Sequence, residues 1–197
     1  MPRQRKFDED VVLTAAMKCF WRQGYPATSM RDLEAATGLT TGSLYNGFEG
    51  KEQLFRAALR HYIHTVVQSR IARYLISGDA RLGILGFVRD GLKRGTTRVN
   101  NGCFLVNTYV EGPLHERKVL DLIAEGRGMI DSALDAAVKR GMEDGTVNPV
   151  SSGEVLAQQI SLLTTALLVR CRTETRRGWY EEPVALLEGL LDGHRAN

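Results

Sequence analysis

Three cysteines, Cys19, Cys103 and Cys171, carry the most reactive side chains in the sequence. Their odd number and wide separation predict free thiols in a reducing compartment rather than a disulfide framework. Cys103 stands near the start of a short expected helix, residues 101–111, where the positive end of the helix dipole favours the reactive thiolate. Cys103 could therefore serve as a sensing thiol. It could equally be a small, inert, buried residue, as free cysteine usually is.

Polar residues placed around Cys103 extend this candidate sensor or ligand site: Asn107, Glu111 and His115, with Tyr62 on an earlier helix. They could line a pocket, or Asn107 and Glu111 could instead satisfy buried backbone groups. Cys103 and His115 could also act as nucleophile and base, but no third orienting group stands at a recognisable spacing, so we do not expect an enzyme. No spacing predicts a metal site, and no motif predicts a cofactor.

The elements that must position these residues are helical by sequence pattern. Apolar residues recur at helical spacing almost throughout, and no alternating strand pattern bounded by turn signals is found. The pattern predicts an all-α chain of nine helices, with approximate ranges 8–24, 29–37, 41–47, 50–76, 79–92, 101–111, 113–141, 152–172 and one that begins at Pro183.

Two of these helices make unusual packing demands. The helix after Asp79 carries Leu82, Leu85, Val88 and Leu92 at helical spacing, which is typical of a buried face. It also contains several glycines, so it is either tightly packed by a neighbour or easily deformed. The helix over 152–172 is apolar on nearly every side and needs a covering surface beyond its own core. Together with the last helix it could form half of a four-helix bundle with a second copy of the chain.

Charge and hydropathy restrict the function only weakly. The net charge is +3, which does not by itself indicate DNA binding. A basic start with Arg3, Arg5 and Lys6 could contact phosphates or could be a solvated terminus. No apolar run approaches the roughly 18 residues of a membrane span, and no signal sequence is evident, so we expect a cytoplasmic protein without a membrane partner.

Two short helices, 29–37 and 41–47, joined by a tight turn that contains Gly38, form the pattern of a helix-turn-helix. In that motif the second helix lies in the major groove of DNA. The expected small core comprises Leu33, Ala36, Leu39, Leu44 and Phe48. The same apolar spacing would serve any helical hairpin, so periodicity alone leaves DNA binding open.

The residues themselves are more specific. The stretch GYPATSMRDLEAATGLTTGSLYNGFEGKEQLFRAAL, residues 24–59, closely resembles the DNA-binding domain of the tetracycline-repressor (TetR) family. The resemblance implies a helix-turn-helix domain over 1–49 and a helical ligand-binding and dimerisation domain over 50–197. It also implies a homodimer formed through the last two long helices, double-stranded operator DNA as partner, and an unidentified effector in a C-terminal cavity.

The resemblance also assigns residues. It places Thr41, Gly42 and Ser43 at the exposed start of the recognition helix, where the family contacts base edges. Tyr45 and Lys51 fall where the family contacts phosphates. The segment NGCFLVNTYVE, residues 101–111, resembles a segment of some of these regulators, a few of which respond to reactive electrophiles or oxidants.

Three residues at the start of the second helix complete the expected DNA contacts: Thr28, Ser29 and Arg31. The alternatives are that Ser29 only caps the helix, with Asp32 reaching back in a capping box, and that Arg31 only pairs with Glu34 or Glu49. At position 47, where many members of the family carry histidine, this chain has Gly47, so we expect no contact there and an early end of the recognition helix. The sequence thus predicts a dimeric repressor that is released by a small molecule or a reactive electrophile.

Overall fold

The computed structural model describes residues 7–93, 101–112, 116–176 and 178–193, and all regular structure in these ranges is helical. If the continuous segment from Lys51 to Tyr74 is counted as one helix, the described residues form nine helices, as predicted. The elements are α1 (Glu9–Gln23), α2 (Met30–Thr37), α3 (Thr41–Phe48), α4 (Lys51–Tyr62), the π-helical turn η1 (Ile63–Val67), α5 (Gln68–Tyr74), α6 (Ala80–Lys93), α7 (Phe104–Val110), α8 (Arg117–Glu143), α9 (Gly153–Arg170) and α10 (Glu181–Asp192).

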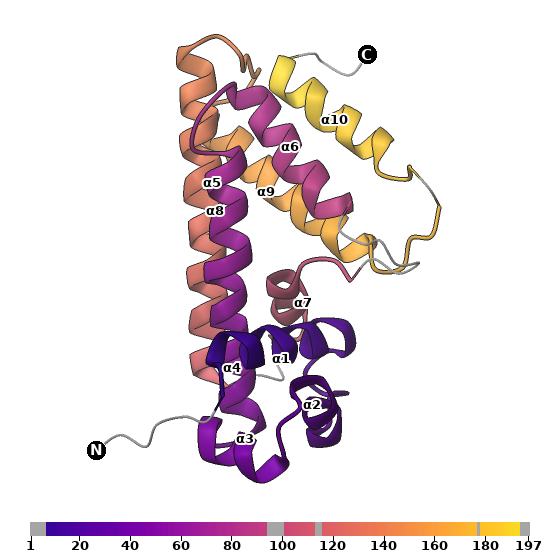
Figure 1. Ribbon diagram of the computed structural model, residues 1–197. Helices are drawn as coiled ribbons and strands as arrows, with labels where there is room; N and C mark the ends of the chain where they lie inside the picture. The colour runs from indigo at the N-terminus through magenta and orange to yellow at the C-terminus, as the bar shows by residue number, and fades with distance from the viewer. Residues whose placement is uncertain (1–6, 94–100, 113–115, 177, 194–197) are drawn as a thin grey trace, which may run out of the picture.

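The first three helices and the start of α4 form one end of the molecule (Figure 1). Their core contains Phe20, Leu33, Leu44 and Phe55, each at most 1% exposed. Leu39 is partly buried against this core, as predicted. The prediction for Ala36 was wrong: its side chain is exposed, because it borders an open surface groove along α1 and not the closed core.

The segment α4–η1–α5 runs from this end along α8 to the far end of the molecule (Figure 1). The sequence predicted one helix over 50–76, and the structure agrees apart from the π-helical turn at Ile63–Val67. Glu49 and Gly50, with φ angles of 60° and 120°, separate this long segment from α3. The proposed domain boundary between residues 49 and 50 coincides with this turn and stays a prediction.

Helix α6 is tightly packed by a neighbouring segment, which is the first of the two alternatives that its glycines left open. A Cβ atom on Gly83 would lie 2.1 Å from the Tyr74 carbonyl oxygen, and one on Gly86 would lie 2.9 Å from the Tyr74 ring. Only glycine permits this approach of α6 to the end of α5. Leu82, which we expected on the inner face of α6, is instead 64% exposed.

Two ion pairs join α6 to α10. Arg81 donates two hydrogen bonds to the Asp192 carboxylate, at 2.6 and 2.8 Å. Arg89 donates to Glu188 at 2.7 Å. Helix α10 begins at Glu181, two residues before the proline that we took as its start, and α8 begins at Arg117; Pro113, the predicted start of that helix, lies outside the described residues.

Helix α9 carries exposed leucine and valine side chains, although its other face packs on α8. Val155, Leu162 and Val169 are 44%, 66% and 42% exposed. Their seven-residue spacing places them on one face of the helix, and we call these three residues the α9 stripe. In the described residues, no helix combines the length and the apolar character needed to cross a membrane.

Candidate nucleic-acid interface and sensor site

The start of α2 is held by the capping box that the sequence predicted. The Ser29 hydroxyl accepts a hydrogen bond from the Asp32 amide at 3.2 Å, and the Asp32 carboxylate accepts from the Ser29 amide at 2.8 Å. The hydrogen bonds from Ser29 hold the pKa of Asp32 below its ordinary value. These bonds satisfy amides that the helix itself leaves free and fix where α2 begins.

A second carboxylate fixes α3 against α2. Glu34 accepts a hydrogen bond from the Thr41 amide, and hydrogen bonding to the side chain and the amide of Thr41 lowers the pKa of Glu34. Thr40 caps α3 by accepting from the Ser43 amide at 3.2 Å. Sequence reasoning missed both roles, because it treated Glu34 only as a possible partner of Arg31.

The first turn of α3 is open on its outer side. Gly42 is exposed, and a Cβ atom built on it would have no neighbour within 4 Å. Thr41 and Ser43 are half-buried, and Tyr45 is 52% exposed. A Cβ atom on Gly50 would lie 3.3 Å from the Tyr45 ring, so this glycine leaves the ring room to lie beside the turn into α4.

The residues at the start of α2 differ in accessibility. Ser29 and Arg31 are exposed. Thr28 does not reach the surface, because its side chain is 1% exposed and its hydroxyl donates to the Gly24 carbonyl at 2.6 Å. Thr28 therefore braces the α1–α2 turn, and we drop it from the candidate DNA contacts.

Lys51 and Glu111 meet at the α1–α2 turn. The Lys51 ammonium lies 4.4 Å from the centre of the Tyr25 ring, and burial lowers the pKa of Lys51 while the Glu111 carboxylate partly offsets this. The Tyr25 amide donates to Glu111 at 3.3 Å. A Cβ atom on Gly24 would lie 2.5 Å from a Glu111 oxygen, so glycine is required at this contact. Glu111, predicted to line a sensor pocket, instead contacts the helix-turn-helix end.

Gly47 has a packing role that the sequence did not reveal. The recognition helix does not end early, because α3 continues through Gly47 to Phe48. A Cβ atom at position 47 would lie 2.9 Å from the Phe7 ring, which packs on Phe48 with ring centres 6.0 Å apart. Phe7 thus occupies the space that a larger residue at position 47 would fill.

Cys103 is the N-cap of α7 and is 3% exposed. The buried Tyr62 hydroxyl donates a hydrogen bond to its sulfur at 3.3 Å. Asn107 donates to the Asn101 carbonyl at 2.8 Å, which agrees with the alternative that it satisfies a buried backbone group. His115 lies outside the described residues.

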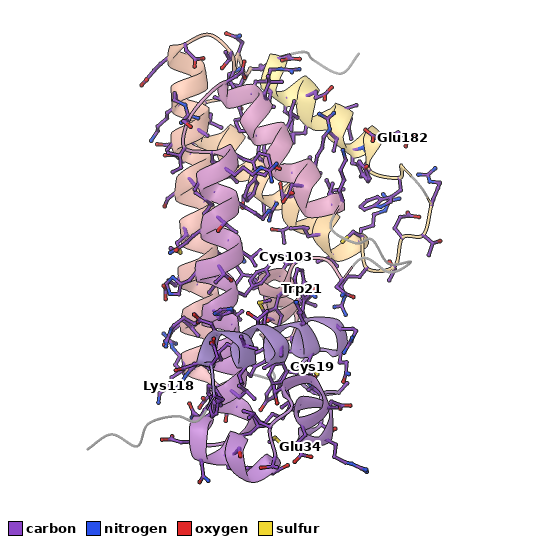
Figure 2. All side chains as sticks on the ribbon, in the orientation of Figure 1. Cys19, Trp21, Glu34, Cys103, Lys118 and Glu182 are labelled. Atoms are coloured by element: carbon purple, nitrogen blue, oxygen red, sulfur yellow. The ribbon has the colours of Figure 1, made fainter. Side chains whose placement is uncertain are left out.

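Figure 2 shows Cys103 close to Trp21 of α1 and well separated from Glu34 at the DNA end. The Trp21 indole donates to the Asn101 carbonyl at 3.1 Å, and its ring contacts the Tyr62 ring edge-on at 5.2 Å. The thiol therefore lies where α1 meets the C-terminal helices. By contrast, burial raises the pKa of Cys171 to about 11, so that thiol stays protonated.

Cys103 also lines a cavity enclosed by α5, α6, α7, α8 and α9. Its free volume is about 30 Å³, which is room for one or two water molecules. Two cavity residues that sequence reasoning missed are Tyr109 and Arg127, whose guanidinium carbon lies 4.3 Å from the centre of the Tyr109 ring. The two residues stand on different helices, so no local pattern could pair them. Within the described ranges, no group of three or more His, Cys, Asp or Glu side chains is arranged to hold a metal ion.

Comparison with known proteins identifies the DNA-binding end. Residues 12–58 match the family model described as bacterial regulatory proteins, tetR family. The chain is 41% identical over 180 residues to the HTH-type transcriptional repressor AcnR of Corynebacterium glutamicum, covering 91% of this chain and 90% of AcnR. It is 27% identical over 172 residues to the HTH-type transcriptional repressor ComR of Escherichia coli, covering 86% and 82% of the two chains.

Solved structures resemble this chain over nearly its whole length. A cysteine-substituted variant of the TetR family regulator CifR, in complex with 26-base-pair double-stranded operator DNA, has 29% identity, a TM-score of 0.75, and coverage of 96% of this chain and 97% of its own. The reduced form of E. coli NemR has a TM-score of 0.81 at 17% identity, with coverage of 95% and 98%, and shows likeness of fold alone. From the near full-length identity to AcnR together with the helix-turn-helix match, we conclude that the chain belongs to the TetR family of bacterial regulatory proteins.

Proposed function

We propose that this protein is a homodimeric transcriptional repressor that binds double-stranded operator DNA through α2 and α3. A signal acting at the cavity beside α7 releases it. The observation that carries the proposal is the exposed first turn of α3, which Glu34 and Thr40 fix in place at its N-terminus. A recognition helix must present its start to the major groove in a fixed orientation, and these bonds supply that rigidity.

Thr41, Gly42 and Ser43 are the proposed base contacts. Hydroxyl groups can donate to or accept from base edges, and the threonine methyl group can contact a thymine methyl group. Gly42 adds no side chain, so the helix can approach the groove floor closely. Because these residues lie in the first turn of α3, they would enter the groove together.

Ser29, Arg31, Tyr45 and Lys51 are the proposed phosphate contacts. Arg31 and Tyr45 are exposed and need no rearrangement to reach DNA. Lys51 lies over the Tyr25 ring and beside Glu111, so a phosphate would compete with that carboxylate for the ammonium. Phosphate contacts of this kind set the position of the protein on DNA rather than its sequence preference.

Release would run through α7. This helix presents one side to the cavity, and the residue that follows it, Glu111, contacts the α1–α2 turn. A cavity of about 30 Å³ cannot hold an organic effector without widening. A widening that shifted α7 would pull Glu111 away from Tyr25 and alter the position of the helix-turn-helix end.

A reactive electrophile is a second candidate signal, favoured by the Tyr62–Cys103 hydrogen bond. This bond holds the sulfur at the wall of the cavity beside α7. An adduct on Cys103 would add atoms to a nearly filled cavity and act on α7 as a bound effector would. We expect N-ethylmaleimide to weaken operator binding by the wild type and to leave Cys103→Ser unaffected; equal responses would rule out Cys103 as the reactive group.

The DNA-binding proposal is tested by fluorescence anisotropy with duplex DNA from upstream of the protein's own gene. Lys51→Ala should weaken binding and make the slope of log K against log salt shallower by about 1.8, as expected for one lost phosphate contact in each of the two protomers. Lys139→Ala is the matched control, since Lys139 pairs with Asp135 on α8. Wild-type protein that binds this DNA no more tightly than random duplex at physiological salt would contradict the proposal.

A further inference from the structure

The mouth of the cavity is marked by two charged residues of α8. Arg127 and Asp131 line the cavity and also line the two open surface grooves beside it, one between α8 and α9 and one between α7 and α8. They therefore stand where the interior meets solvent.

The two arginines of the cavity differ in how their charge is satisfied. Arg70, which is 5% exposed, donates to the Asp90 carboxylate at 2.9 Å and to the Phe87 carbonyl at 2.5 Å. The Arg127 guanidinium carbon lies 4.3 Å from the centre of the Tyr109 ring, within cation–π distance. In the described part of the chain, no acceptor lies within hydrogen-bonding distance of the Arg127 guanidinium, and no carboxylate lies within 4.0 Å of it.

This arrangement leaves the donors of Arg127 available. A guanidinium has five N–H donors in its plane, and stacking on an aromatic ring occupies its face but not its edge. A half-buried cation with unused donors at the entrance of a cavity favours an anion, above all a carboxylate that can accept two parallel hydrogen bonds. The contact with Tyr109 also keeps the guanidinium close to the cavity before a ligand arrives.

The interior behind Arg127 is mostly apolar, apart from Arg70, whose charge is paired, and the threonines of α9. Phe87, Leu105, Ile130, Leu134 and Leu168 contribute to its wall. The hydroxyl of Thr164 is already used, because it donates to the Ile160 carbonyl at 2.7 Å. The wall therefore suits hydrocarbon rather than a polyol or a sugar.

We propose that the effector is a small organic anion, with a single carboxylate held by Arg127 at the mouth and an apolar body placed between α7 and α9. This inference rests on the proposed function and names the chemical class of its signal. The body displaces α7, because the free volume of about 30 Å³ is smaller than any such molecule.

Asp131 stands one helical turn from Arg127, and its negative charge would repel an anion bound there. Its carboxylate already accepts a hydrogen bond from the Ser161 hydroxyl at 2.6 Å, and the residue is exposed to solvent. Water therefore screens its charge, while Arg127 is half-buried. An amine held by Asp131 is the competing ligand, and the experiment must distinguish the two.

Thermal denaturation of the full-length protein with three probes of equal chain length makes this distinction. We expect octanoate to raise the melting temperature, and octan-1-ol and octylamine to bind at least about tenfold more weakly, since they lack the charge-assisted pair. Arg127→Gln should bind octanoate about tenfold more weakly than the wild type does, and Arg127→Lys should bind it with an intermediate affinity. Arg117→Gln is the control, because Arg117 is exposed on the same helix and pairs with Asp121.

The proposal is overturned if octanoate produces no shift at millimolar concentration, if Arg127→Gln binds it as well as the wild type, or if octylamine binds most tightly and loses binding in Asp131→Asn. Operator binding is measured in the same samples. Octanoate that binds through Arg127 and weakens operator binding supports both inferences. Octanoate that binds through Arg127 without any effect on operator binding supports the anion site and overturns the effector role.

Discussion

The α9 stripe of Val155, Leu162 and Val169 predicts how the dimer is held together. Leu162 is the most exposed of the three, at 66%. A two-fold interface presents the same residue from both protomers, so one substitution acts twice. We therefore expect Leu162→Asp to dissociate the dimer while each protomer keeps its fold, because the side chain contributes little to the protomer core.

The size of the effect follows from the exposed fraction. Full burial of a leucine side chain contributes about 1.5–3 kcal/mol. Because 66% of Leu162 is still available for burial, the dimer gains about 1–2 kcal/mol per protomer from it and about 2–4 kcal/mol in total. Loss of this term alone weakens association by about 30- to 700-fold, and desolvation of the new carboxylate weakens it further.

Sedimentation velocity from nanomolar to micromolar protein measures the change, with circular dichroism to verify the fold. Leu82→Asp is the matched control, since Leu82 is 64% exposed but lies on α6. The control should stay dimeric and bind operator normally, whereas Leu162→Asp should be monomeric and lose tight operator binding. Equal dissociation of both variants, or none in Leu162→Asp, would show that the α9 stripe is not the interface.

Three further predictions concern the DNA end. Gly47→Ala should displace the Phe7 ring and weaken operator binding as much as Phe7→Ala, with no further loss in the double variant, as measured by anisotropy. Because the pKa of Glu34 is lowered in the folded protein, its bond to α3 stabilises the fold fully above the unfolded-state pKa of about 4.3. This stabilisation is lost as pH falls through the folded-state pKa, and thermal melts of Glu34→Gln should lack this acid dependence. Glu111→Gln should reduce the release caused by an effector, because it weakens the link to the α1–α2 turn, and full release in this variant would exclude the Glu111 route.

The sequence predicted those features of the fold that are decided within one or two helical turns. The capping box of Ser29 and Asp32 is an example, because both partners stand three residues apart and their bonds need nothing from the rest of the chain. The glycine after α2, Gly38, has a φ angle of 70° and ends the helix where expected.

The errors arise where helices meet. Ala36 and Leu82 have apolar neighbours at helical spacing, yet both side chains are exposed, because the width of a buried face depends on which helix packs against it. Thr28 resembled a surface cap, but its hydroxyl turns back to the Gly24 carbonyl. Helical periodicity predicts which side of a helix is buried, but it does not predict how many residues on that side are buried.

The candidate sensor site was predicted only in part for the same reason. Cys103 and Tyr62 were both selected, and the structure joins them by a hydrogen bond across 41 positions of the chain. The mouth residues Arg127 and Tyr109 were missed, since an arginine on a long amphipathic helix is usually solvated. What distinguishes Arg127 is its aromatic partner Tyr109 on α7, and no helical spacing relates residues on two different helices.

One contact limits how strongly the cavity can control DNA binding. Glu111 is linked to the α1–α2 turn by the Tyr25 amide, at a rather long 3.3 Å, and by its charge near Lys51. A hydrogen bond to a charged group contributes about 1.5–3 kcal/mol, and the long distance favours the lower figure. If release depends on this link, an effector can change operator affinity by about tenfold per protomer. Because both protomers of a dimer hold one operator, the two changes multiply to about a hundredfold. If the repressor is present at about ten times its dissociation constant, a change of this size leaves the operator mostly unoccupied.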